Sequence, residues 1–128
     1  MKNTLPKTES LKSKKLIRLL FESGKSEFCY PFKILYKEVE LGEKHPAQYM
    51  ISVSKKRIRT AVGRNHIKRL FREAYRQNKH SLHEVLIEND KTLALVFIFV
   101  GKPNIKYQQV EDKMKIAIAS LTEKMRKF

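Results

Sequence analysis

Residues 92–100 read TLALVFIFV, and Leu93 to Val100 is the longest uninterrupted apolar run of the chain. This run is far shorter than the roughly 20 apolar residues that a membrane-spanning helix needs, so it predicts a strand. A strand without alternating polar residues is typical of a sheet position that is buried on both faces. We therefore expect this strand to belong to a sheet that is covered on both sides.

Helical patterns flank this strand on both sides in the sequence. Before it, apolar residues recur at positions i, i+3, i+4, i+7 and i+8 from Ile67 to Tyr75, which is the spacing of an amphipathic helix. A shorter pattern at residues 82–86 indicates an extra short helix. After the strand, apolar residues at three- and four-residue spacing mark a last amphipathic helix from Tyr107 to Met125.

The residues before the first of these helices predict a hairpin. Phe28 to Leu41 holds aromatic and β-branched residues in partial alternation, and Tyr49 to Ser54 alternates as well. Between them, residues 42–46 (GEKHP) have the composition of a turn. An isolated hairpin is only marginally stable, so we expect the apolar strand to complete the sheet.

The start of the chain divides into a polar stretch and a helix. Residues 1–9 have no periodicity, and we expect them to form a flexible basic segment. Residues 11–23 have helical spacing, and Gly24 follows where a left-handed helix cap is common. The order α-β-β-α-β-α, with the extra short helix, predicts a single α+β domain over residues 10–128, in which helices lie on a small sheet.

The charge of the chain is large and unevenly distributed. Its 128 residues include 28 Lys and Arg against 13 Asp and Glu, for a formal net charge of +15. Residues 55–80 hold ten basic residues and one acid, Glu73, while residues 1–25 hold seven basic residues and two acids. Because such a charge repels itself, it indicates a polyanionic partner, nucleic acid before an anionic membrane surface.

The basic residues of the helix around Ile67 lie on one arc and its apolar residues on another, at 100° per residue. A solvated charged surface is the plain alternative, but such surfaces usually mix signs. Like charges four residues apart destabilise a helix by roughly 0.2–0.5 kcal/mol per pair, which a bound anion would offset. Arginine suits phosphate oxygens, and Asn65 suits a base edge or a 2′-hydroxyl, so we expect a nucleic-acid contact.

Candidate catalytic residues are few. Metal-assisted phosphodiester hydrolysis needs carboxylates, and Glu73 is the only acid among residues 55–80. His80 and His83 are three residues apart and could form a metal or acid/base pair, although surface histidines are the commoner interpretation. Cys29 is the only cysteine and is interpreted as a packing residue, and we expect a reducing cytoplasm.

Two motifs are similar to those of a known family. SVSKK at residues 52–56 and AVGRNHIKRLFREAYR at residues 61–76 closely resemble the signature of the bacterial ribonuclease P protein component. A weaker likeness extends from about Leu11 to Leu121. The resemblance implies a single RNA-binding domain with a mostly antiparallel sheet and a left-handed β-α-β crossover. It also implies a subunit of the endonuclease that removes the 5′ leader from precursor tRNA.

The resemblance further implies two sets of site residues. The helix face that meets the catalytic RNA maps onto Lys55, Lys56, Arg64, Asn65, His66, Lys68, Arg69, Arg72 and Arg76. His66 stands where the family usually has arginine, which removes a fixed charge at that position. The residues that meet the single-stranded leader map onto Ile17, Phe21 and Phe32, with Ile17 in place of an aromatic ring. For each ring, packing in the core is the alternative.

The partners implied by the resemblance are the catalytic ribonuclease P RNA and precursor tRNA, without a membrane. Catalysis is expected to reside in the RNA, which uses Mg²⁺, and no metal or cofactor bound by the protein is expected. A ribosome-associated or general RNA-binding protein is the main alternative, because it also explains the charge. A nuclease that acts without RNA is a second alternative, and it depends on the histidine pair.

Overall fold

The computed structural model describes residues 5–41 and 45–126. Its elements in chain order are the 3-10 turn η1 (Lys7–Glu9), α1 (Lys14–Ser23), β1 (Lys25–Cys29), β2 (Phe32–Glu38), β3 (Ala47–Ser52), α2 (Ala61–Asn78), α3 (His80–Glu88), β4 (Leu93–Phe99) and α4 (Tyr107–Arg126). The predicted α+β class, the extra short helix and the mostly antiparallel sheet are confirmed.

The four strands form one sheet in the order β1-β2-β4-β3. β2 pairs antiparallel with both β1 and β4, and β3 pairs parallel with β4. The predicted hairpin between residues 28–41 and 49–54 is therefore wrong, because β4 lies between β2 and β3. β3 and β4 are instead joined by a crossover through α2 and α3. Part of the predicted turn, residues 42–44, lies outside the described residues.

The predicted strand from Phe28 to Leu41 is also wrong, because it contains two strands. β1 ends at Cys29 and β2 begins at Phe32, with a turn at Tyr30 and Pro31, whose peptide bond is cis. Cys29 and Phe32 are paired across this turn.

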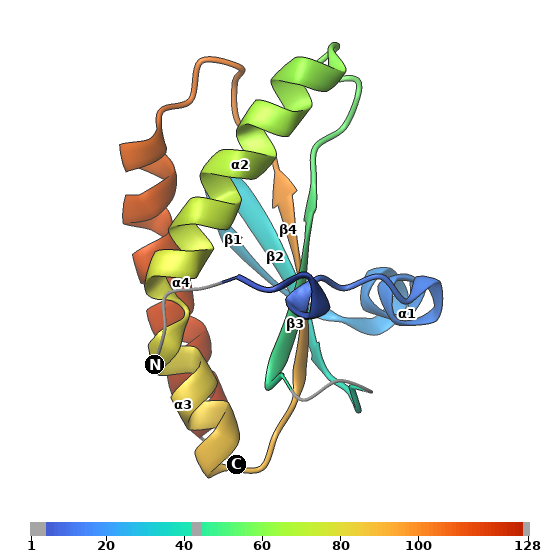
Figure 1. Ribbon diagram of the computed structural model, residues 1–128, viewed down its shortest axis with the longest axis vertical. Coiled ribbons are helices and arrows are strands. Elements are labelled where there is room, and N and C mark those ends of the chain that lie inside the picture. Colours follow the sequence, from blue (N-terminus) through green and yellow to red (C-terminus); the bar gives the residue numbers. More distant parts are fainter. Residues whose placement is uncertain (1–4, 42–44, 127–128) are drawn as a thin grey trace.

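The sheet is covered on both faces, as expected. α2, α3 and α4 pack on one face and α1 packs on the other (Figure 1). Side chains of β4 alternate between the two cores: Leu95 and Phe97 belong to the large core under α2 and α4, and Ala94 and Val96 belong to the small core under α1. This double burial is the reason that residues 93–100 are apolar without alternation.

Helix α1 starts later than predicted and ends without a left-handed residue. Ser13 caps it by accepting a hydrogen bond from the backbone N–H of Leu16. Leu11 lies before the helix, and its N–H donates to the carbonyl of Tyr49 in β3 at 2.7 Å. Gly24 has a φ of −70°, so the predicted left-handed cap is wrong. Glycine fits there because a Cβ atom would lie 2.5 Å from the carbonyl oxygen of Leu20.

The predicted flexible segment at residues 1–9 overlaps a region that the structure shows to be ordered. Residues 1–4 lie outside the described part of the chain, but residues 7–9 form η1. Glu9 is only 2% exposed, and its Oε2 accepts a hydrogen bond from Nζ of Lys79, itself 4% exposed, at 2.6 Å. A buried ion pair therefore fastens the N-terminal segment to the junction between α2 and α3. Among the described residues, no helix combines the length and the apolar character needed to span a membrane.

Candidate nucleic-acid interface

Helix α2 divides into a packed side and an open side, as its periodicity predicted. Ile67, Phe71, Ala74 and Tyr75 are buried in the large core. On the opposite side, most of the predicted RNA contacts reach solvent. Asn65, His66, Arg69 and Arg72 are exposed, and Arg64, Lys68 and Arg76 are partly exposed.

The segment between β3 and α2 extends this basic surface. We call residues 55–60 the basic loop; Lys55 and Lys56 in it are exposed. Ile58 is buried and anchors the loop to the large core. Thr60 caps α2, because its Oγ1 accepts a hydrogen bond from the N–H of Gly63 at 3.0 Å. The burial of Ile58 and the cap of Thr60 thus fix the basic loop relative to the first turn of α2.

Two of the predicted cations make contacts within the protein. Nη1 of Arg64 donates hydrogen bonds to the carbonyl oxygens of Ile58 and Arg59, both at 3.0 Å. Nε and Nη2 of Arg76 donate to the two carboxylate oxygens of Glu73 at 3.0 and 2.7 Å. The hydrogen bond from Arg76 holds the pKa of Glu73 below its usual value. Neighbouring Glu73 therefore compensates part of the charge of Arg76.

The structure contradicts the predicted leader contact at Phe32. Its side chain has 0% exposure and lies in the large core. Its ring packs edge-on against Phe71 and Phe97, with centroids 5.3 and 5.9 Å apart. Phe32 is therefore on the face of the sheet opposite α1 and is a packing residue, which is the alternative left open for each ring.

The other two predicted leader contacts are on α1. Ile17 is half-buried against the small core, and Phe21 is 54% exposed. The sequence reasoning missed Phe28, whose ring is 67% exposed. Phe28 pairs with Lys33 of β2, two residues before Leu35 of the small core, so its side chain is on the face that α1 covers. Phe21 and Phe28 thus offer two open rings on the α1 side.

Neither Cys29 nor His83 is an open reactive group. Sγ of Cys29 donates to the carbonyl of Lys113 at 3.6 Å, and burial raises the pKa of its thiol. The ring of His83 is buried and its Nε2 lies 3.0 Å from the hydroxyl of Tyr75. Burial, followed by the charge of Lys79, lowers the pKa of His83 to about 3. Within residues 5–41 and 45–126, no three or more His, Cys, Asp or Glu side chains form a group that could hold a metal ion.

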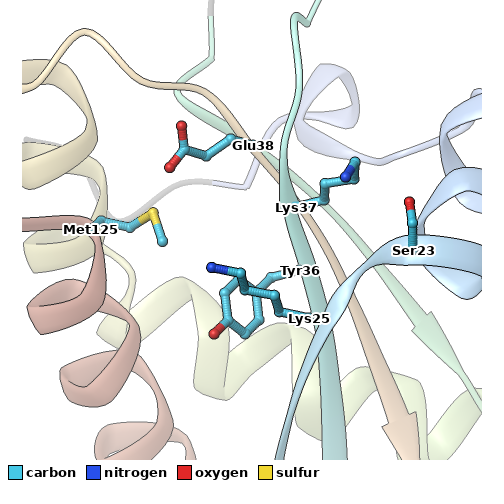
Figure 2. Close-up of a pocket in the computed structure, with 6 residues that line it drawn as sticks. All are labelled: Ser23, Lys25, Tyr36, Lys37, Glu38 and Met125. Atoms are coloured by element: carbon cyan, nitrogen blue, oxygen red, sulfur yellow. The ribbon is translucent and has the colours of Figure 1, made fainter. Parts of the chain in front are cut away.

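A cavity of about 230 Å³ lies at the end of β2 and is shown in Figure 2. The side chains of Lys25 and Glu38 lie on the same side of β2 as Met125, and that of Lys37 lies on the opposite side (Figure 2). The carboxylate of Glu38 is also 3.7 Å from Nζ of Lys91. The lining therefore carries both signs of charge, and it contains none of the predicted site residues.

Comparisons with known proteins agree with the motif resemblance. Residues 5–122 match the family model described as Ribonuclease P. The chain is 40% identical over 114 residues to the ribonuclease P protein component of Porphyromonas gingivalis, covering 87% of this chain and 81% of that relative. It is 34% identical over 104 residues to the ribonuclease P protein component of Chlorobaculum tepidum, covering 76% and 68%.

Two solved structures have the same fold. The RNase P protein from Thermotoga maritima aligns with a TM-score of 0.69 at 23% identity, covering 87% of this chain and 96% of that one. The Staphylococcus aureus RNase P protein aligns with a TM-score of 0.68 at 21% identity, covering 89% and 97%.

Proposed function

Because the chain belongs to the ribonuclease P protein family and is a protein component of that tRNA-processing ribonucleoprotein, we propose that its basic loop and α2 bind the RNA subunit. The observation that carries this proposal is the open side of α2, where exposed Arg69 and Arg72 lie opposite a fully packed apolar stripe. Arginine pairs its donors with phosphate oxygens, and Asn65 adds a group that both donates and accepts.

We propose that cleavage itself takes place in the RNA subunit. The support is the charge of the surface that would meet the RNA, since Glu73 is its single carboxylate between residues 55 and 80 and is engaged by Arg76. Mg²⁺, held by RNA phosphates, would supply the activated water and stabilise the leaving oxygen. The protein's part is to neutralise phosphates and so lower the Mg²⁺ concentration that folding and substrate binding require.

We propose that precursor tRNA binds with its single-stranded leader on the α1 side of the sheet. Phe21 and Phe28 provide exposed rings there, and Lys33 is the cross-strand partner of Phe28. Stacking on such rings accepts any base, while lysines attract the backbone. Ile17 supports the small core beneath α1, and its half-buried position leaves less surface for stacking than an open ring has.

The test is reconstitution with the cognate ribonuclease P RNA. Cleavage of precursor tRNA is measured at low magnesium with RNA alone, protein alone, and both together. We expect cleavage at the mature 5′ end only when RNA is present, with a large gain when the protein is added. No gain would contradict the subunit role, and recovery of ribosomal RNA as the main bound species would favour the ribosome-associated alternative.

Replacing both Arg69 and Arg72 by glutamine is expected to weaken binding of the RNA subunit. The binding constant of the double variant should also depend less steeply on salt concentration. Each lost phosphate contact lowers the slope of log K against log salt by about 0.7–0.9, so the double variant should lose roughly twice that. Binding is measured by filter retention from low to high salt. Lys115→Gln on α4 is the control, because Lys115 is an exposed cation that is not among the predicted RNA contacts. An unchanged slope in the double variant would show that Arg69 and Arg72 do not contact RNA phosphates.

Phe28→Ala is expected to weaken binding of leader-bearing precursor tRNA without affecting mature tRNA. Loss of one stacked base costs about 1–3 kcal/mol, and Phe21→Ala should have an effect of the same kind. Affinities for both tRNA forms are measured with the reconstituted holoenzyme. Ile116→Ala is the control, since Ile116 is an exposed apolar residue on α4. Equal losses for precursor and mature tRNA would assign the effect to folding rather than to the leader.

A further inference from the structure

We propose that Arg64 is a positioning residue, which holds the basic loop in its RNA-binding conformation. This inference rests on the proposed function, because it concerns how the same surface is built. Arg64 is a motif residue, and its position on α2 alone would group it with Arg69 and Arg72. The contacts of the three side chains separate them.

The guanidinium of Arg64 makes hydrogen bonds within the protein. Its Nη1 donates to the carbonyls of Ile58 and Arg59, both at 3.0 Å, and one of these bonds is partly buried. Arg69 and Arg72 are exposed, and within the described residues neither side chain makes a hydrogen bond or an ion pair. The four arginines of α2 therefore differ in their contacts: Arg64 binds the loop, Arg76 binds Glu73, and Arg69 and Arg72 are open to a ligand.

The basic loop packs closely against the first turn of α2, next to the hydrogen bonds of Arg64. A Cβ atom on Gly63 would lie 2.7 Å from Cγ2 of Ile58 and 2.9 Å from Oγ1 of Thr60, so only glycine allows this approach. The N–H of Ile58 also donates to the carbonyl of Ser54 at 3.1 Å, which closes the loop on itself. Gly63 thus allows the loop to lie close to α2, and Arg64 holds it there through its two hydrogen bonds.

The loop needs such a brace because of its charge. Lys55, Lys56, Arg57 and Arg59 place four cations within five residues, and they repel one another. Ordering a flexible loop costs conformational entropy, so a loop that is not held in place would lose binding free energy when RNA orders it. A cation that binds two loop carbonyls removes this cost before RNA arrives, and prior ordering of a binding segment increases affinity.

A double-mutant cycle with the cognate ribonuclease P RNA tests the proposal. The variants are Arg64→Gln, the loop pair Lys55→Gln with Lys56→Gln, and all three changes together. If Arg64 positions the loop, the loop changes should weaken RNA binding several-fold less in the Arg64→Gln protein than in the wild type. The control cycle with Arg69→Gln should be additive to within about twofold, as independent contacts are. Additivity in the Arg64 cycle would overturn the proposal.

A second measurement on the free protein covers the case in which Arg64→Gln disturbs folding. Amide hydrogen exchange at residues 55–60 should be faster in Arg64→Lys, which keeps the charge but not the planar fork, while exchange in β4 stays unchanged. Unchanged exchange in the basic loop would contradict the positioning role. A wild-type protein that does not bind the RNA at all would instead contradict the proposed function, so the two failures are distinguishable.

Discussion

Phe32→Ala is expected to lower the free energy of unfolding by about 3–5 kcal/mol, the range for removing a large aromatic side chain from a core. Phe32 has no exposed surface and packs edge-on against Phe71 and Phe97, which come from α2 and β4. The neighbours belong to different elements and cannot close the gap without moving the sheet relative to α2. Denaturant unfolding followed by circular dichroism measures the change.

Phe28→Ala is the matched control for this prediction. It removes the same side chain from the opposite face of the same hairpin, where the ring is largely exposed, so its effect on stability should stay within about 0.5 kcal/mol. Phe32→Ala should therefore lower the free energy of unfolding, and Phe28→Ala should lower the affinity for leader-bearing precursor tRNA. A stable Phe32→Ala protein with a specific loss of precursor affinity would return Phe32 to the leader site.

Glu9→Ala is expected to destabilise the protein by a similar amount, about 3–5 kcal/mol, because it leaves the ammonium of Lys79 buried without its carboxylate. Glu9 and Lys79 are among the least exposed charged residues of the described chain, and their charged atoms are 2.6 Å apart. The midpoint and the slope of urea unfolding measure the loss. The slope should not change if only stability is affected.

Replacing both partners separates the ion pair from the packing around it. Glu9→Leu combined with Lys79→Met leaves no unpaired charge, and such replacements are often neutral or stabilising. The double variant should therefore recover most of the stability that Glu9→Ala loses. Wild-type stability in Glu9→Ala would contradict the structural role of the pair. The pair matters for the RNA-binding surfaces because residues 9–13 run from the α2–α3 junction past β3 to α1.

Helix α2 is the part of the fold and the site that the sequence predicted best. Four residues of its apolar stripe are buried and Leu70 is partly buried, and the predicted contacts Asn65, His66, Arg69 and Arg72 are exposed. The prediction succeeded because a helix places residues on faces by local geometry alone, with 3.6 residues per turn. The same reasoning predicted α4 and the short helix α3.

The β1–β2 hairpin shows where local reasoning fails. In one continuous strand, Phe28 and Phe32 would share a face, because four residues separate them. The turn at Tyr30 and Pro31 reverses the chain so that Cys29 is opposite Phe32, and Phe28 is placed on the other face. A single turn therefore placed the two rings on opposite faces, with Phe32 in the core and Phe28 exposed.

The helices, the buried strand, the positive charge of α2 and the basic loop, and the family signature could all be read from the chain, because they are properties of neighbouring residues. The folded structure was needed to show that β4 separates β2 from β3, that Phe28 rather than Phe32 is exposed, and that Glu9 is paired with Lys79. It also distinguished Arg64 and Arg76, which make contacts within the protein, from the open Arg69 and Arg72. These outcomes depend on partners brought together by folding, and hydrogen bonds, strand pairing and burial are set by such partners rather than by residue type.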